Sequence, residues 1–373
     1  DHLKPNGKFH FMNLKLVKLI SIVLYYPAEI FAASIYVKPG ETVNNTDLNN
    51  GDTQYVIGGT ATNTSVGAGA YQYVTDGFAT GTIIKAYGKQ FVNGGSATGT
   101  IIKGSGHQGV IDGGSATGTI IEDTGSQGVN GGSATGTIIK GSGAQYVHLG
   151  PVTGTIFEGS GVQIVYGGHV TDTIFKGYGT QIVHGGHVTD TIVSTRSNQE
   201  VHGGSVSNTT VTHGGGLYLY NGTVNNVKVS GQDSHFHVMP IEADNKPVIT
   251  GDITISDKGQ IVLSYGADSS GADMTVSNDA SLQLNNAAAC TTNCLYTLNS
   301  LALSGGSVAL YNTPPGASTG WNTLNLSSLS GNGDFYMHTE VASGKGDLLN
   351  ITGNATGSFR LFVQDSGVSP TSD

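Results

Sequence analysis

Hydrophobic and polar positions recur along the chain with a fixed period. A Gln-x-Val segment returns every 18 residues from Gln54 to Gln199, apart from one 19-residue step after Gln108. A Thr-x-(Ile, Phe or Val) segment lies half a period away, at Thr82, Thr100, Thr119, Thr137, Thr155, Thr173, Thr191 and Thr209. Gly-rich stretches such as GG and GSG separate the two segments. Each period therefore predicts two short β-strands joined by Gly-rich corners.

Alternation within the Gln-x-Val segment assigns its side chains to two faces. The third position is apolar in every copy, from Val56 to Leu219, so we expect it to point into a core. The middle position varies from Tyr55 through Gly109 to Glu200, and we expect it to point outward. The Gln shares the face of the Val. There it forms either a ladder of stacked amides or a cap on local backbone at a corner.

The Thr-x-Ile segment is interpreted in the same way. Its Thr and its third residue face inward, and its middle residue faces outward, which places an apolar stripe on the surface: Ile83, Ile101, Ile120, Ile138, Ile156, Ile174 and Ile192. Large apolar patches are uncommon on soluble monomers. The next position is charged, with mostly opposite signs in neighbouring copies: Lys85, Lys103, Glu122, Lys140, Glu158 and Lys176. These charges predict weak cross-strand pairs.

A period near 20 residues with two strand segments is typical of a solenoid, in which stacked units bury a core that no single unit can bury. Leucine-rich repeats have a similar period but require several Leu residues per unit, and these units contain almost none. The 58 Gly residues disfavour helices, while Val, Ile, Thr and Tyr are abundant. We therefore predict an all-β chain folded as a right-handed parallel β-helix from about residue 34 to 365, regular over residues 34–230.

The N-terminal residues have the pattern of a secretory signal peptide. Lys15 and Lys18 precede an apolar stretch from Leu19 to Tyr26, and small residues follow near Ala32. We assign residues 1–33 to a signal peptide with an N-terminal extension, with cleavage near Ala32; a buried N-terminal helix is the alternative.

Two cysteines fit an exported chain. Cys290 and Cys294 lie in the stretch CTTNC, which predicts a small disulfide loop in an oxidising compartment, with metal binding as the less favoured alternative.

Charge and site chemistry exclude several functions. The net charge of −10 argues against nucleic-acid binding, which depends on Lys and Arg. Ser, His and Asp are all present, but the His residues recur in the repeat register, whereas a catalytic site requires one asymmetric arrangement. We therefore predict no enzyme activity, no catalytic residues and no cofactor. His169 and His187, followed by Asp172 and Asp190, form a minor candidate for Zn or Ni binding, although a stacked histidine pair is favoured and no metal site is predicted.

The repeats resemble a known family. The stretches GGSATGTII, GGHVTDTIF and SVSNTTVTHGG, joined to Gln-x-Val, are similar to the passenger repeats of AIDA-type self-associating autotransporter adhesins of Gram-negative bacteria over roughly residues 34–230. Downstream, Ser330 to Gly367 resembles the pertactin-like C-terminal β-helix that nucleates passenger folding. The resemblance therefore implies that residues 231–373 form an irregular β-helix ending in an autochaperone-like region.

The resemblance also implies a location. Members of this family are exported through the periplasm, and a C-terminal barrel, inserted by the outer-membrane insertion machinery, displays the passenger at the cell surface. No segment before Asp373 shows the serial alternating strands of such a barrel. Surface display is therefore expected of the parent protein, with release as a second outcome.

Two functions follow from these expectations. The first is self-association or adhesion to a host surface, as in a biofilm, through outward side chains on the repeats: Tyr55, Tyr73, Phe91, Tyr146, Asn93, Asp112 and Asn130. The second is a passive β-helical stalk, or a remnant of a truncated autotransporter, without binding activity.

The family resemblance further implies a modification. Dedicated heptosyltransferases O-glycosylate Ser residues at repeat corners of such passengers, and the matching positions are Ser96, Ser115 and Ser133, followed by Ser105, Ser142 and Ser160. Ordinary turn chemistry is the alternative, because Ser and Gly are common corner residues.

Overall fold

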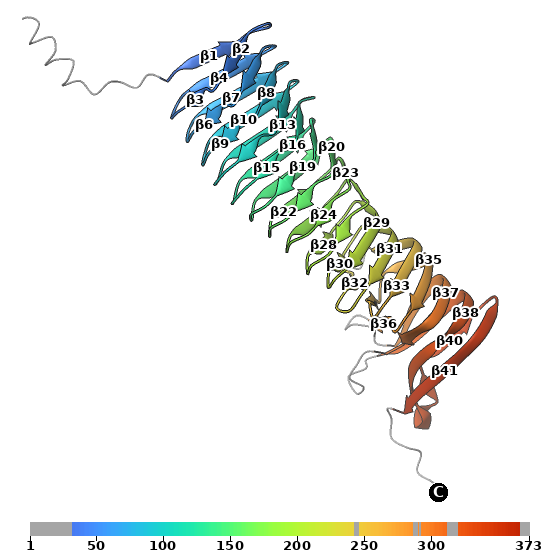
Figure 1. Cartoon of the computed structure of the whole chain (residues 1–373). Helices are drawn as coiled ribbons and strands as arrows, with labels where there is room; N and C mark the ends of the chain where they lie inside the picture. Colours follow the sequence, from blue (N-terminus) through green and yellow to red (C-terminus); the bar gives the residue numbers. More distant parts are fainter. Residues whose placement is uncertain (1–31, 242–245, 286–289, 291, 312–319, 366–373) are drawn as a thin grey trace, which may run out of the picture.

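The computed structural model describes residues 32–241, 246–285, 290, 292–311 and 320–365. The strands wind around one axis into an elongated rod, from the N-terminal coils at one end to the C-terminal strands at the other (Figure 1). Successive coils pair as parallel strands, so that Val56 lies beside Val74 and Val92 beside Val110. The predicted parallel β-helix is confirmed. Of the predicted signal peptide and extension, residues 1–33, all but the last two residues lie outside the described residues.

Each regular coil contains three strands, so our prediction of two was wrong. The first strand occupies the Gln-x-Val position: β1 (Ser34–Val37), β4 (Thr53–Ile57), β7 (Tyr71–Thr75), β10 (Lys89–Asn93), β13 (His107–Ile111), β16 (Ser126–Asn130), β19 (Ala144–Leu149), β22 (Val162–Val165), β25 (Thr180–Val183), β28 (Asn198–Val201), β30 (Gly216–Leu219), β32 (His235–Val238), β34 (Gln260–Ser264) and β36 (Ser281–Asn285).

The second strand is the one that the sequence pattern did not reveal: β2 (Thr42–Asn44), β5 (Thr60–Thr62), β8 (Phe78–Thr80), β11 (Ser96–Thr98), β14 (Ser115–Thr117), β17 (Ser133–Thr135), β20 (Pro151–Thr153), β23 (His169–Thr171) and β26 (His187–Thr189). In the early coils its inward residue is a buried alanine, such as Ala97 or Ala116. A single small side chain between Ser and Thr gives no apolar signal, and we had assigned this stretch to a corner.

The third strand holds the Thr-x-Ile segment: β3 (Asp47–Leu48), β6 (Ser65–Val66), β9 (Ile83–Ile84), β12 (Ile101–Ile102), β15 (Ile120–Ile121), β18 (Ile138–Ile139), β21 (Ile156–Phe157), β24 (Ile174–Phe175) and β27 (Ile192–Val193). Its outward Ile residues stack on one another, as Ile101 does on Ile83 and Ile120. Most are half-buried, and Ile192 is 39% exposed. The stripe therefore faces outward as predicted, but its members partly cover each other.

Strands two and three merge beyond Ser205 into β29 (Ser205–Thr212), β31 (Thr223–Ser230), β33 (Val248–Ser256) and β35 (Asp268–Ser277). The C-terminal elements are β37 (Asn293–Ala309), β38 (Trp321–Glu340), the 3-10 helix η1 (Val341–Ser343), β39 (Lys345–Gly346), β40 (Leu348–Ile351) and β41 (Ala355–Asp365). A disulfide joins Cys290 to Cys294, and Cys294 lies at the start of β37.

A hydrogen-bonded glutamine ladder runs through the interior. The Gln side chains from Gln54 to Gln199 are fully buried, and from Gln72 onward each Nε2 donates to the Oε1 of the preceding Gln at 2.6–2.8 Å. The same Oε1 accepts a second bond from the Thr of its own coil, as Thr137 Oγ1 donates to Gln127 at 2.9 Å. This geometry confirms the amide ladder and is incompatible with the alternative of a corner cap.

The ladder divides the apolar core into two columns. The Val residues of the first strand pack with the Ala or Val residues of the second, whereas a separate column contains Ile84, Ile102, Ile121, Ile139, Phe157 and Phe175. Burial of these side chains provides the main driving force for stacking the coils. At the outer surface, one pair of the predicted charge series, Lys103 and Glu122, lies at 3.7 Å. Both side chains are solvent-exposed, so this pair contributes little.

Candidate adhesive surface

Four aromatic rings form a continuous stack near the N-terminal end of the rod. Tyr36, Tyr55, Tyr73 and Phe91 take the outward middle position of β1, β4, β7 and β10, and the register places each beside the next. Their ring centroids are 5.0, 5.4 and 5.5 Å apart, with interplanar angles of 10–18°. We call these four residues the aromatic ladder. Because the spacing matches that of the coils, the repeat itself produces the stack.

Tyr36 was missed by the sequence analysis. It belongs to the first coil, where Ile35 occupies the position that Gln54 takes in the next one. Our search was anchored on the Gln, although the Tyr-Val pair that follows was present as a signal. The side chain is 54% exposed because it begins the stack.

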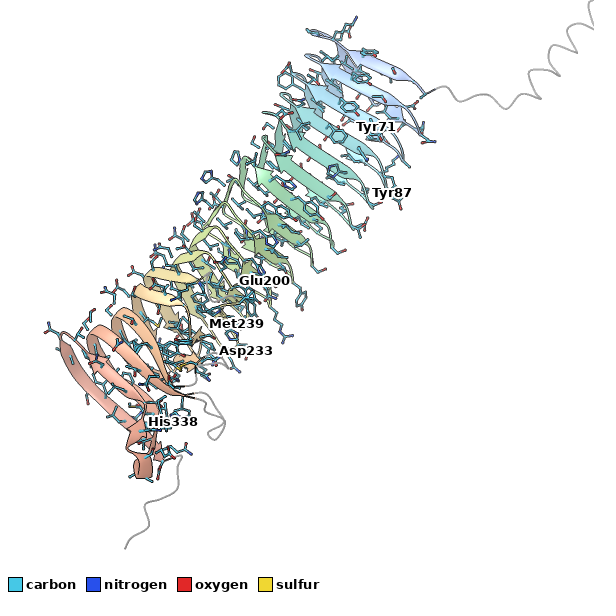
Figure 2. The ribbon with its side chains drawn as sticks, turned by 180° about the vertical axis from the view of Figure 1, so that it is seen from behind. Tyr71, Tyr87, Glu200, Asp233, Met239 and His338 are labelled. Atoms are coloured by element: carbon cyan, nitrogen blue, oxygen red, sulfur yellow. A yellow bond between two sulfur atoms is a disulfide. The ribbon has the colours of Figure 1, made fainter. Side chains whose placement is uncertain are left out.

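Tyr71 and Lys89 add to this face. The ring of Tyr71 lies 6.0 Å from that of Tyr73, nearly parallel to it, and Lys89 Nζ lies 5.7 Å from the Tyr71 centroid. Figure 2 shows Tyr71 among the first coils of the rod. The surface around the ladder therefore combines aromatic rings with a cation.

The ladder ends at Phe91, because Gly109 and Gly128 occupy the next two places in the register. A Cβ atom at Gly109 would lie 2.8 Å from the Phe91 ring, so the ring covers a position that only glycine leaves open. His107 packs edge-on against Phe91 at 6.1 Å and hydrogen-bonds through Nδ1 to Ser126 Oγ at 2.9 Å. Burial, with a smaller effect of Lys89, lowers the pKa of His107.

Tyr146 is separate from this ladder. It follows Gly128 in the register, so two glycine positions lie between it and Phe91. The sequence analysis grouped the four outward aromatics Tyr55, Tyr73, Phe91 and Tyr146 into one face, and they do lie on the same side of the coils. Of these four, only Tyr55, Tyr73 and Phe91 belong to the continuous stack.

The corner candidates are exposed but not all in one column. Asn93 pairs with Ile111, and Asn130 takes the corresponding place in β16. Asp112 is one residue further along: it is the extra residue of the 19-residue coil, it has a left-handed φ of 46°, and its N–H donates to the Asn130 carbonyl at 3.3 Å. Asp112 therefore lies in the turn beyond the position that Asn93 and Asn130 share.

The candidate serines divide into two groups. Ser96, Ser115 and Ser133 begin the second strands, lie in mutual register and are half-buried. Ser105, Ser142 and Ser160 lie in the turns after the third strands and are exposed. The second group is thus the more accessible to a modifying enzyme.

A second column of stacked rings lies at the end of the first strands, in later coils than the aromatic ladder. His148, Tyr166, His184, His202 and Tyr220 each follow the inward apolar residue of the first strand, and neighbouring centroids are 4.6–5.5 Å apart. We call them the His–Tyr ladder. Glu200 Oε2 lies 3.5 Å from His202 Nε2. Burial, together with a smaller effect of the Glu200 charge, raises the pKa of Tyr218 and Tyr220. Glu200 is labelled about halfway along the rod in Figure 2.

This column matches the expectation that the histidines stack in register. Among the described residues, no group of three or more His, Cys, Asp or Glu side chains is arranged to hold a metal ion.

Comparison with known proteins supports the resemblance to autotransporters. Residues 298–373 match the Pertactin family model. The chain is 42% identical over 151 residues to the probable autotransporter YpjA of Escherichia coli K12, and 50% identical over 50 residues to the autotransporter adhesin/invasin TibA of E. coli O78:H11. These alignments cover 39% and 13% of this chain.

A solved structure extends the likeness to most of the rod. The TibC-catalysed, hyper-glycosylated TibA55-350 fragment superposes with a TM-score of 0.52 at 30% identity, covering 69% of this chain and 94% of that fragment. The chain belongs to the AIDA-type autotransporter passengers. It spans 10% of the length of YpjA and 5% of that of TibA, so it corresponds to a part of such proteins. No helix within the described ranges is long and apolar enough to cross a membrane.

Proposed function

We propose that this passenger is a non-enzymatic adhesin of the Gram-negative cell surface and that it mediates self-association through the aromatic ladder. The observation that carries the proposal is the continuous stack of Tyr36, Tyr55, Tyr73 and Phe91 on an outer face. Apolar rings at a surface gain free energy when a second surface covers them. One relative, TibA, is named an adhesin/invasin, which supports the same reading.

The ladder suits side-by-side contact between two rods. Its rings repeat at the coil spacing of about 4.8 Å, so a second copy meets the same contact several times in succession. Contacts that are weak individually then add through avidity. A passive stalk would have no need of a continuous aromatic stack on its outer face.

The test replaces Tyr55, Tyr73 and Phe91 together by Ser and measures settling of displaying cells or clustering of beads coated with purified protein. These side chains lie outside the core, so the β spectrum should persist while clustering falls several-fold. The matched control is Ile164→Ser with Ile182→Ser, which changes outward residues of the same register in later coils. If the triple variant and the control both cluster like the parent, the chain acts as a stalk or adheres through another face.

We further propose that a glycosyltransferase modifies the turn serines. The basis is exposure: Ser105, Ser142 and Ser160 are exposed, and the related TibA fragment was solved in a hyper-glycosylated state. Co-expression with a heptosyltransferase should add heptose mass increments, and replacing the three by Ala should remove more of them than replacing Ser96, Ser115 and Ser133. The reverse order would contradict the assignment, and an unmodified intact mass would leave turn formation as their role.

A further inference from the structure

Two stacked histidines lie on the surface of the second-strand column, each three residues beyond a member of the His–Tyr ladder. His169 begins β23 and His187 begins β26, and the two residues are register partners on adjacent coils. Both side chains are exposed, their ring centroids are 5.0 Å apart, and the ring planes differ by 16°. Two imidazoles are therefore presented to solvent side by side.

One of these rings is held in a defined orientation. His187 Nδ1 lies 2.5 Å from the hydroxyl of Ser205, the register partner of His187 on the following coil. When Nδ1–H donates to this oxygen, the proton is fixed on Nδ1 and the lone pair of Nε2 is left for a ligand. This is the arrangement found in metal-binding histidines, in which the second ring nitrogen is hydrogen-bonded to a neighbour.

We propose that His169 and His187 bind a divalent transition-metal ion such as Zn²⁺ or Cu²⁺, with Ser205 as the positioning residue. Imidazole suits these ions, and Zn–N bonds of about 2.0–2.1 Å place two nitrogens of a tetrahedral site roughly 3.4 Å apart. In the stacked arrangement the planes differ by only 16°, so the two in-plane lone pairs run nearly side by side, and the rings must tilt toward each other about χ1 and χ2 to converge on one ion. Both side chains are exposed, which leaves room for this rotation. Water completes the coordination, so the ion stays open to donors from another surface.

The neighbouring charges and rings distinguish this pair from others. Asp172 and Asp190 lie three residues further on, in the turn after each strand, and Asp190 Oδ1 accepts a bond from Asn208 at 3.2 Å. They contribute negative potential and not ligands. In the His–Tyr ladder, His184 and His202 are also neighbours, with ring centroids 5.4 Å apart, but their planes are tilted by 31° and His202 Nε2 faces Glu200 Oε2 at 3.5 Å. That pair therefore lacks the near-parallel, serine-bonded arrangement of His169 and His187.

Calorimetric titration of the full chain with ZnCl₂ tests the pair directly. The parent should bind one more Zn²⁺ than H169A or H187A, and S205A should bind about tenfold more weakly because the ring of His187 loses its partner. H148A, the control from the His–Tyr ladder, should titrate like the parent, because the ring beside His148 in the stack is Tyr166 and not a second histidine. With Cu²⁺, the electron paramagnetic resonance spectrum should show two equatorial nitrogens that either pair variant loses. Equal Zn²⁺ binding by the parent, H169A and H187A would overturn the proposal.

A transplant tests whether the geometry suffices. Ser96, Ser115 and Ser133 hold the same second-strand position on three successive coils, so S96H with S115H rebuilds the pair and leaves Ser133 in the role of Ser205. The double variant should gain one equivalent of Zn²⁺ over the parent, and S115H alone should not. Failure of the folded double variant to gain an ion would show that adjacent stacked histidines in this register do not make a site.

Discussion

At the residue scale, the fold depends on a buried polar side chain that repeats. Each Gln of the ladder would be costly in an apolar core if left unpaired, because a buried amide without partners loses its hydration. Here the Oε1 accepts from both the next Gln and the Thr of its own coil, as for Gln127, which accepts from Gln145 at 2.7 Å and Thr137 at 2.9 Å. The ladder therefore fixes which coil residues lie opposite one another, since a slip by one residue would bring Gln beside apolar side chains.

Gln127→Met tests this dependence. Met keeps the approximate length of Gln, but leaves the Gln145 amide and the Thr137 hydroxyl without their acceptor, so the free energy of unfolding should fall by about 2–4 kcal/mol. Adding Thr137→Val removes one orphaned donor and should recover part of that loss, a coupling that a double-mutant cycle measures. Denaturant unfolding followed by circular dichroism provides the values. Thr135→Ala, at an exposed position of β17, should change them by less than about 0.5 kcal/mol; a loss as large as that of Gln127→Met would show that the assay does not report the ladder.

At the residue scale too, a buried pair stabilises the C-terminal end. The Asp347 carboxylate is fully buried, accepts the N–H groups of Asn322 and His338 at 2.9 Å each, and is hydrogen-bonded by His338 Nδ1. The rings of Trp321 and Tyr311 pack against His338, which is labelled near the C-terminal end of the rod in Figure 2. Three separate donors on one carboxylate tie β38 to the segment before β40.

At the element scale, the sequence predicted the strands that carry large apolar or amide side chains and missed the strand whose inward residue is small. Inward Val and Gln, outward aromatics and the solenoid itself followed from alternation and an 18-residue period. The second strand did not, because Ala97 and its equivalents are too small to mark a core position. The continuous ladder and the separate place of Tyr146 depend on Gly109 and Gly128, whose effect requires knowing which residues stack.

The contacts within the C-terminal elements could not be predicted from the sequence for a related reason. Residues that meet there, such as His338 and Asp347, are buried with no periodic partner in the sequence. A pattern search detects contacts that recur at one spacing, and a contact that occurs once has no spacing. The position of Asp112, which a single inserted residue displaces, could not be predicted in this way. The position of His169 beside His187 could, because the two residues recur at the spacing of the repeat.

At the scale of the whole molecule, the rod is a one-dimensional stack in which each coil pairs with the coil before it and the coil after it. Its stability should then be close to a sum of coil terms and nearest-neighbour interfaces. Different surface features occupy different lengths of the same rod, as the aromatic ladder near Tyr55, the His–Tyr ladder near His184 and the histidine pair at His169 do.

Removal of one complete coil should therefore be tolerated, whereas removal of half a coil should not. Deleting residues 109–127 joins Gln108 to Gly128, restores an 18-residue step to Gln145 and leaves a Gln-x-Val segment at the junction. The shortened rod should keep its β spectrum and lose about 4.8 Å of length, because every remaining side chain keeps a partner in register. Deleting residues 109–117 instead places first-strand residues opposite third-strand residues, so that the buried Gln and Thr positions lose their partners.

Circular dichroism, thermal unfolding and small-angle scattering distinguish the two deletions. We expect cooperative unfolding for the complete-coil deletion and a broad, low-temperature transition for the half-coil deletion. Because the first lies beyond Phe91, it leaves the whole aromatic ladder intact, so cell clustering should persist at the level of the parent. A complete-coil deletion that unfolds would mean that the 19-residue coil stabilises the rod beyond its neighbours, and one that folds but no longer clusters would place the adhesive contact at the glycine gap beyond the ladder.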